Sequence, residues 1–223
     1  MKTNALQSAL EAVSTVLTPA QMSALDPVIK PLNTQGLLAV SPRSLDEIIA
    51  IFEICNSTGT PLIAHGGRTS LAGAVAANGS EIMLLGTKMP SILRVDPVSQ
   101  TVHVSANTTL ASLEVAARAH NLTAGIDIAA RDSGGMISTN AGGMEAHRNG
   151  TMRERVLGLQ AVLPDGTILN DLAQVRKCNE GYDIKQLLIG AEGTLGVITA
   201  ATLQLLPEPP EPHTFLLALP DAA

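Results

Sequence analysis

The sequence predicts a globular fold of mixed helices and strands, built as one large domain or as two small lobes. Hydrophobic residues make up 45% of the 223-residue chain and charged residues 15%, a balance typical of a protein with a buried core. Segments whose apolar residues recur at helical spacing alternate with short apolar runs of strand length. Gly-rich segments follow or precede several of these runs, where they allow a ligand to approach the backbone closely.

Residues 1–36 are expected to form a helical segment at the N-terminus. Residues 4–17 place four apolar side chains on one helical face. These are Leu6, Leu10, Val13 and Leu17. A second short helix is expected after Pro19, with Thr18 as its cap, and Pro27 then interrupts the helical pattern.

Residues 37–206 alternate short strands with helices. The helix expected at 44–57 opens with a capping box that includes Glu47, and it ends before Gly59. Another helix is expected at about 110–120. Strands are expected at residues 37–40, 62–64, 82–85, 92–95, 101–105, 156–163, 167–169, 197–206 and 214–219, with tight turns at Asp96-Pro97 and Asp165-Gly166.

The first Gly-rich loop, residues 65–73, follows a buried strand directly. Its glycines allow several backbone N–H groups to point at one ligand, while Thr69 and Ser70 add hydroxyl donors and Arg68 adds positive charge. This combination favours a pyrophosphate site over an ordinary turn. The candidate ligand-binding residues of this loop are Gly66, Gly67, Arg68, Thr69, Ser70 and Leu71.

The second Gly-rich segment, residues 133–143, has two Gly-Gly pairs that bracket small polar residues. Such a segment allows a flat, extended ligand to lie against the backbone. Close packing of two backbones also requires glycine and remains the alternative. The candidate ligand-binding residues here are Ser133, Gly134, Gly135, Ser138, Thr139, Asn140, Gly142 and Gly143.

The third Gly-rich segment, residues 190–199, leads into the long strand at 197–206. Taken alone, its glycines indicate a bulge or a turn. The sequence has no GxGxxG motif that opens a helix after the first strand, and no GxxxxGK[ST] motif. The common Rossmann and P-loop nucleotide folds are therefore poorly supported.

The composition argues against nucleic acid as a partner. The formal net charge is −6, and the Arg153/Arg155 and Arg176/Lys177 pairs are expected to be solvated surface rather than a basic stripe. Aromatic residues number one Tyr, two Phe and no Trp, too few for a platform that stacks bases.

Cysteine usage and hydropathy predict a cytoplasmic protein. The two cysteines, Cys55 and Cys178, stand far apart and form no CxxC motif, which fits a reducing compartment. No apolar run approaches the roughly 18–20 residues that span a bilayer, and the N-terminus does not read as a signal peptide.

Four ordered motifs in residues 37–212 resemble the FAD-binding domain of the vanillyl-alcohol-oxidase/PCMH flavoprotein family. They lie at 61–73, 135–150, 156–166 and 181–199, and include Ser-Thr-Asn-Ala-Gly-Gly and Glu-Gly-Thr-Leu-Gly. The sequence is most similar to the group that contains the glycolate oxidase D-subunit, D-lactate dehydrogenase and D-2-hydroxyglutarate dehydrogenase.

The resemblance implies an α+β fold in which two α/β lobes hold an extended FAD between them. The FAD-binding domain is expected at 37–212, with lobe one at about 37–105 and lobe two at about 106–206. In the family, a cap domain that supplies the substrate pocket follows the Pro-rich linker. Residues 213–223 are then the start of a cap domain that is otherwise missing, and no catalytic residue and no metal ligand is assigned.

The resemblance also implies roles for the Gly-rich segments. Loop 66–71 would wrap the pyrophosphate with backbone N–H groups, and residues 133–143 would line the ribityl and pyrophosphate side. Val197 and Ile198 would meet the adenine end of FAD through backbone groups, and Gly196 beside them is also a candidate cofactor-binding residue. The flavin would accept a hydride from the carbon that bears the substrate hydroxyl.

Two departures from the family pattern concern the cofactor. Some members attach FAD covalently through a histidine at the position of Arg68, so non-covalent FAD is expected here, with His65 as a packing or capping residue. Asp132 stands where the family tends to carry Thr. An acid close to the FAD phosphates is unfavourable, so weakened binding is expected.

Three functions remain open on the sequence alone. The first is the FAD-binding part of a 2-hydroxy-acid dehydrogenase, whose small substrate would bind only with a cap domain or a partner subunit. The second is a truncated FAD-binding module that pairs with another chain as a dimer or hetero-complex. The third and least favoured is another flavoenzyme of the same fold, such as a nucleotide-sugar reductase or an alditol oxidase.

Overall fold

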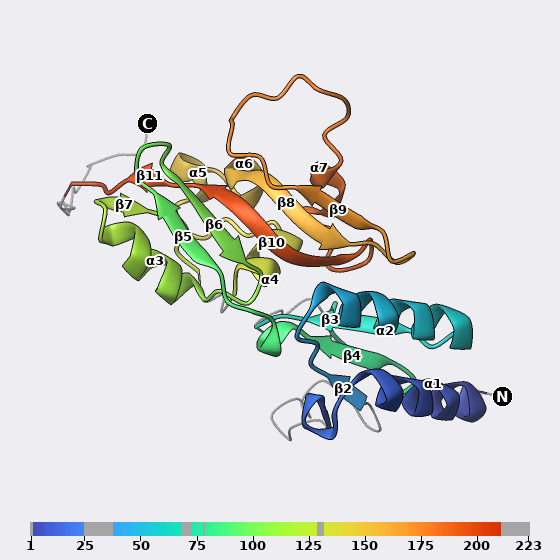
Figure 1. The fold of residues 1–223 in the computed structure, drawn as a ribbon. Helices are drawn as coiled ribbons and strands as arrows, with labels where there is room; N and C mark the ends of the chain where they lie inside the picture. Colours follow the sequence, from blue (N-terminus) through green and yellow to red (C-terminus); the bar gives the residue numbers. More distant parts are fainter. Residues whose placement is uncertain (1, 25–37, 68–72, 78, 129–131, 211–223) are drawn as a thin grey trace, which may run out of the picture.

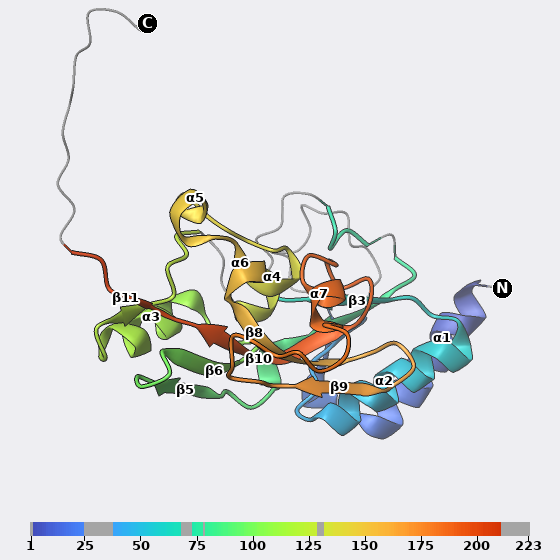
Figure 2. The same ribbon diagram turned by 90° about the horizontal axis from the view of Figure 1, so that it is seen from above.

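The chain forms two lobes, each a β-sheet with its own helices, that lie side by side (Figure 1). This computed structural model describes residues 2–24, 38–67, 73–77, 79–128 and 132–210. The helices α1 and α2 lie next to the sheet of the first lobe, and the shorter helices α3 to α7 lie on one side of the sheet of the second (Figures 1 and 2). The mixed α+β fold with two lobes is as the sequence predicts.

The first lobe contains a four-stranded sheet in the order β1-β2-β4-β3. Strands β2, β4 and β3 run parallel, and β1 pairs antiparallel with β2. The elements are α1 (Lys2–Val16), η1 (Pro19–Gln21), β1 (Met22–Ala24), β2 (Leu38–Val40), α2 (Leu45–Thr58), β3 (Leu62–His65), β4 (Ile82–Leu85) and η3 (Gly86–Lys88).

Helix α2 shows how local sequence sets the boundaries of an element. The Ser44 hydroxyl accepts a hydrogen bond from Glu47 N at 3.2 Å, and Gly59 ends the helix in the left-handed region with φ 66°. Ser44 is therefore confirmed as the cap. The Glu47 carboxylate accepts hydrogen bonds from Arg43 N and Gln21 Nε2, each at 2.7 Å, and so links α2 to η1.

The second lobe contains an antiparallel sheet in the order β5-β6-β10-β8-β9. Its strands are β5 (Leu93–Asp96), β6 (Thr101–Ser105), β8 (Val156–Val162), β9 (Ile168–Asp171) and β10 (Val197–Gln204). Its helices are α3 (Leu110–Arg118), α4 (Ser133–Ser138), α5 (Ala146–Asn149), α6 (Met152–Arg155) and α7 (Lys185–Leu188). Side chains of α3, α4 and α6 share one hydrophobic core with β6, β8 and β10.

The two lobes join through apolar packing and a hydrogen bond. Val162, at the end of β8, is fully buried in the core of the first lobe, among side chains of α1, α2 and β4. Asn56, near the end of α2, donates a hydrogen bond from Nδ2 to the carbonyl oxygen of Pro164 at 2.7 Å. The hairpin between β8 and β9 is thus held against α2, which fixes the junction where both lobes present Gly-rich segments.

Two elements differ from the sequence-based prediction. The long strand expected at 197–206 is interrupted after β10, and a second strand, β11 (Leu206–Pro207), pairs with β7 (Leu122–Thr123) instead. The segment expected to be Gly-rich backbone at 133–143 begins with the helix α4. The strand expected at 214–219 and the break at Pro27 lie outside the described residues. Among the residues described, no helix is long and apolar enough to cross a membrane.

Candidate functional site

The first and second Gly-rich segments meet at the junction of the lobes. Gly66 and Gly67 come directly after β3, while Asp132 immediately precedes α4. A Cβ atom built on Gly66 would lie 2.7 Å from Asp132 Oδ1, so only glycine allows this approach. Two segments some 65 positions apart in the sequence therefore contact each other through a carboxylate.

The Asp132 carboxylate collects hydrogen bonds from both segments. Its Oδ1 atom accepts a hydrogen bond from Gly135 N at 2.6 Å and caps α4. The backbone N–H of Gly67 also donates to this carboxylate. Burial raises the pKa of the Asp132 carboxyl above its ordinary value, and the two backbone hydrogen bonds oppose that rise only in part.

Of the candidate residues in the first loop, Gly66 and Gly67 belong to the described part of the chain. Arg68, Thr69, Ser70 and Leu71 lie outside it. His65, which precedes them at the end of β3, is 4% exposed. Its burial agrees with the packing role expected for it.

The polar side chains of the second segment bond to the protein itself. The Ser133 hydroxyl is fully buried and donates to the carbonyl oxygen of Thr108 at 3.0 Å. The Thr139 hydroxyl donates to Gly135 O at 2.8 Å, and Asn140 Oδ1 accepts from Arg153 N at 2.9 Å. These three groups hold α4 and the turn that follows it.

The glycines of the second segment are explained largely by close packing. A Cβ atom on Gly134 would lie 2.8 Å from Ala106 Cβ, and one on Gly142 would lie 2.7 Å from Ala146 Cβ. Gly143 has φ 72°, and a Cβ atom there would collide with Asp127 O. The alternative raised for this segment, close approach of protein segments, therefore accounts for these three glycines.

The third Gly-rich segment is attached to the C-terminal end of α4. Gly190 N donates to Ile137 O at 3.1 Å, and Glu192 N donates to Ser138 O at 2.8 Å. These bonds satisfy carbonyl groups that a helix end otherwise leaves unpaired. Gly196, just before β10, has φ 156°, and a Cβ atom there would lie 2.7 Å from Val162 O. The structural role inferred for this segment agrees with these contacts.

The structural role of Arg153 and Arg155 was not predicted from the sequence, because both were expected to be solvated. Arg153 is half-buried and donates from its guanidinium to Gln186 O at 2.8 Å and to Ile189 O. Arg155 is 3% exposed and donates to Asn149 O. The prediction that both side chains are solvated was wrong. Each donates to backbone carbonyl groups that only the fold brings close to it.

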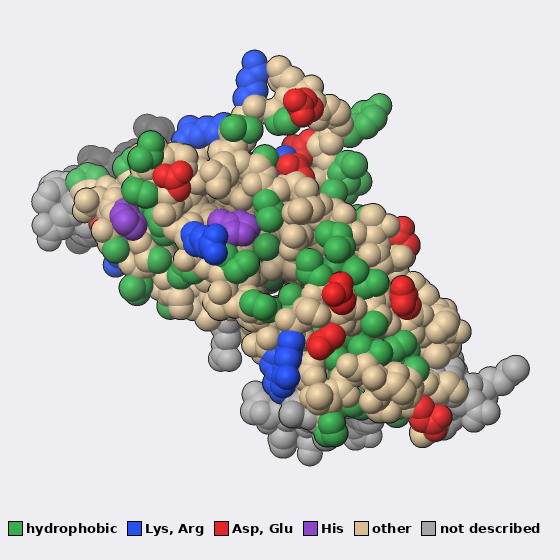
Figure 3. Space-filling model, in the orientation of Figure 1, with side chains coloured by type: hydrophobic (Ala, Val, Ile, Leu, Met, Phe, Trp, Pro, Cys, Tyr) green, Lys and Arg blue, Asp and Glu red, His purple; other side chains and the backbone are tan. Residues whose placement is uncertain are grey.

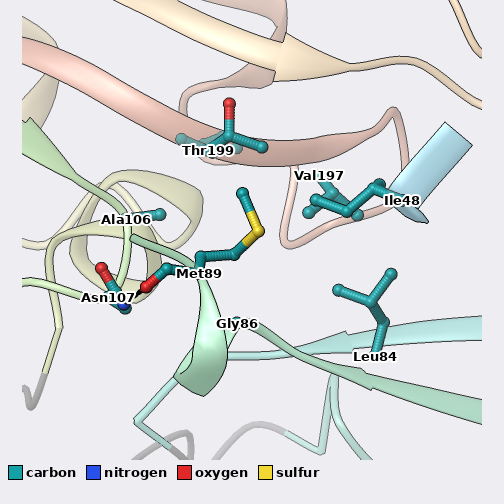
Figure 4. Close-up of a pocket in the computed structure, with 9 residues that line it drawn as sticks. Ile48, Leu84, Gly86, Met89, Ala106, Asn107, Val197 and Thr199 are labelled. Atoms are coloured by element: carbon teal, nitrogen blue, oxygen red, sulfur yellow. Dashed lines mark hydrogen bonds between the residues drawn. The ribbon is translucent and has the colours of Figure 1, made fainter. Parts of the chain in front are cut away.

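Val197 and Ile198 line a small apolar pocket between the lobes, shown in Figure 4. The side chains of Ile48, Leu84 and Met89 reach it from the first lobe. Its volume is about 20 Å³, enough for about one water molecule. Asn107 Nδ2 donates to Met89 O at 2.8 Å across this junction. The pair predicted to meet an adenine thus does lie at the interface between the lobes.

The described residues offer no obvious alternative chemistry. No three His, Cys, Asp or Glu side chains among them come together in a way that could hold a metal ion. Burial raises the pKa of the Cys55 thiol to about 11, so this cysteine is not a nucleophile at neutral pH. On the face in Figure 3, the Lys and Arg side chains lie apart and form no basic patch.

Comparison with known proteins identifies similar sequences. The sequence pattern of the FAD binding domain family matches residues 37–171. The chain is 41% identical to a D-2-hydroxyglutarate dehydrogenase of Xanthomonas citri pv. viticola, over 84% of this chain and 40% of the relative. It is 39% identical to a D-lactate dehydrogenase of Archaeoglobus fulgidus, over 82% and 41%. It is 37% identical to a mitochondrial D-2-hydroxyglutarate dehydrogenase of Bos taurus, over 87% and 36%.

Solved structures share the fold at low sequence identity. An alkyldihydroxyacetonephosphate synthase superposes with a TM-score of 0.75 at 20% identity, over 90% of this chain and 40% of that one. The grass pollen allergen Phl p 4, described as having glucose dehydrogenase activity, superposes with a TM-score of 0.72 at 17% identity, over 89% and 44%. The chain thus spans about 40% of the length of the curated relatives it matches.

Proposed function

The chain belongs to the FAD binding domain family, and from that membership we propose that it binds FAD non-covalently where its two lobes meet. The observation that carries this proposal is the convergence of Gly67 N and Gly135 N, one from each Gly-rich segment, on a single carboxylate. Backbone N–H groups that converge on one anion also suit a phosphate oxygen. The Asp132 carboxylate thus occupies the place that we propose for a phosphate oxygen of FAD.

Each part of the junction has a proposed role in binding. Residues 66–71 hold the pyrophosphate through backbone N–H groups, and residues 133–143 form the wall beside it. Val197 and Ile198 border the pocket between the lobes and contact the adenine end. Because this pocket holds about one water molecule, side chains such as Met89 have to move before a ring enters. We propose the boundary between the lobes between β4 and β5 rather than near residue 105, because β5 and β6 pair within the sheet of the second lobe.

The proposed reaction is that of the relatives, oxidation of a 2-hydroxy acid. FAD, when bound, supplies the hydride acceptor. The residues of this chain bind and orient it. We propose that substrate recognition lies in parts of the relatives beyond the matched region, and that the chain acts together with a further domain or a partner subunit. We propose a cytoplasmic location, although relatives such as the Bos taurus protein are mitochondrial.

A second candidate function is an FAD-binding module that has no catalysis of its own and pairs with another chain. In this candidate the matched region, which includes 84% of this chain and 40% of a relative, binds FAD by itself. The two candidates make the same prediction about FAD. They differ in turnover of D-2-hydroxyglutarate or D-lactate with an artificial electron acceptor, which the module alone would not support.

An absorption spectrum tests the proposed function. The purified protein is incubated with FAD, freed of unbound flavin by gel filtration, and measured before and after denaturation. We expect flavin bands that co-elute with the folded protein and are released into solution by the denaturant. A protein that stays colourless after this treatment would contradict FAD binding, and flavin that stays attached after denaturation would contradict the non-covalent mode.

A further inference from the structure

We infer that Asp132 determines the FAD affinity of this chain, because its charge occupies the backbone N–H groups that face the pyrophosphate and must be neutralised when FAD binds. The inference rests on the proposed function and adds to it a proton that is taken up with the cofactor. Three features of the junction carry it: the contacts of the carboxylate, its partial burial without an ion pair to any described residue, and its position beside Gly66.

The contacts place the carboxylate inside the proposed pyrophosphate cradle. Gly67 N and Gly135 N both donate to it, the second at 2.6 Å. A Cβ atom built on Gly66 would lie 2.7 and 2.8 Å from its two oxygens, so the loop backbone lies directly against both. A phosphate that approaches Gly66 and Gly67 therefore approaches Asp132 as well. It competes with this side chain for the same N–H groups.

The described residues around Asp132 give its charge little compensation. None of the ion pairs formed by described residues includes Asp132. Helix α4 has the sequence SGGMIS and carries no charge, and the segment Ala106–Thr108 against which it packs carries none either. The ionisable group of β3 is His65, next to Gly66 in the chain. Arg68 and Arg131 lie outside the described residues. Burial raises the pKa of Asp132 above its ordinary value and so favours its protonated form.

FAD binding and protonation of the Asp132 carboxyl are therefore linked. Two like charges in one poorly solvated site disfavour each other, so the pyrophosphate raises the proton affinity of Asp132 further. FAD binding is then tightest when Asp132 is neutral. Between the carboxyl pKa of the free protein and that of the complex, the Kd rises by up to about tenfold for each pH unit.

The test compares the full chain with two charge-removing variants. Asp132→Asn keeps a side-chain oxygen for capping α4 and removes the charge. Asp96→Asn is the matched control. The Asp96 carboxylate also accepts two backbone hydrogen bonds, from Val98 N and Ser99 N, but it lies at the turn between β5 and β6. FAD is titrated into each protein by flavin fluorescence at a series of pH values from about 4, near the ordinary pKa of an aspartate, to about 8. Circular dichroism verifies that each variant is folded.

The expected result is a Kd that is at least about tenfold lower for Asp132→Asn than for the wild type near neutral pH, with a flatter pH dependence. Asp96→Asn should match the wild type at each pH. Any pH dependence that survives in Asp132→Asn belongs to groups other than the Asp132 carboxyl. Should Asp132→Asn fail to fold, Asp132→Thr replaces it, because Thr is also a neutral cap.

Two outcomes overturn the inference, and they have different meanings. If Asp132→Asn binds FAD as the wild type does or more weakly, with the same pH slope, then the carboxylate helps to form the site rather than opposing the phosphates. The proposed function survives that result. If neither folded protein binds FAD at any pH, the proposed function itself fails and the inference fails with it.

Discussion

Asp132 is proposed to affect FAD binding, and its ionisation also affects the stability of the fold. Its side chain is half-buried at the lobe junction, and its pKa in the folded state is raised chiefly by desolvation. A residue-by-residue view of the sequence detected it as a departure from the family pattern. Its partners, Gly67 and Gly135, could not be foreseen from the sequence, because one of them is distant along the chain and is brought to Asp132 only by the packing of the lobes.

The raised pKa predicts how stability varies with pH. In the folded protein the carboxyl holds its proton to higher pH than in the unfolded chain. Its stabilising contribution is therefore fully present below the unfolded pKa and is lost as pH rises through the folded pKa. We expect the Asp132→Asn variant to lose less thermal stability than the wild type as pH rises through that window. Differential scanning calorimetry in the absence of FAD measures this.

Asp96 serves as a control, because its contribution to stability depends on pH in the opposite direction. Hydrogen bonds from Ser99 and Val98 lower the pKa of its carboxyl. Its contribution is therefore present above the unfolded pKa and is lost as pH falls through the folded pKa. Identical pH profiles for Asp132→Asn and the wild type would show that the Asp132 carboxyl is not desolvated as described.

At the scale of elements, α4 is a helix that its neighbours impose. Its six residues include two glycines, which gives it a poor intrinsic preference for helix and too little length to be stable alone. Asp132 caps one end, and Gly190 N and Glu192 N bond to carbonyl groups at the other. This explains why the sequence predicted α2, with its local cap and glycine stop, but did not predict α4.

Close packing of α4 against Ala106 predicts the cost of a single methyl group. In Gly134→Ala, the new Cβ would lie 2.8 Å from Ala106 Cβ and 3.2 Å from Ala106 O. Neither atom can move without moving the backbone, so we expect a loss of about 1–3 kcal/mol in the free energy of unfolding. Denaturant unfolding followed by circular dichroism measures it.

Gly86→Ala is the matched control for that substitution. A Cβ atom on Gly86 meets nothing within 4 Å, so its free energy of unfolding should stay within about 1 kcal/mol of the wild type. A Gly134→Ala variant as stable as Gly86→Ala would mean that α4 lies farther from Ala106 than described. The glycines of this segment would then need another explanation, such as contact with the ligand.

At the scale of the whole molecule, the lobes are joined by a few specific contacts. Val162 of the second lobe is buried in the core of the first, and Asn56 bonds to Pro164 O. The sequence predicted most strands from apolar runs bounded by turn residues, such as β5 and β6 around Asp96. It did not predict the pairing of β11 with β7, nor the burial of Arg155, because both depend on contacts between distant segments.

The central claim is that FAD binds at this junction, and amide hydrogen–deuterium exchange with and without FAD tests it most directly. We expect FAD to slow exchange in peptides that cover residues 62–73 and 132–143, and around Val197. Exchange on the outer faces of α1 and α3 should stay unchanged. Protection confined to segments away from the junction, or no change at saturating FAD, would contradict the account.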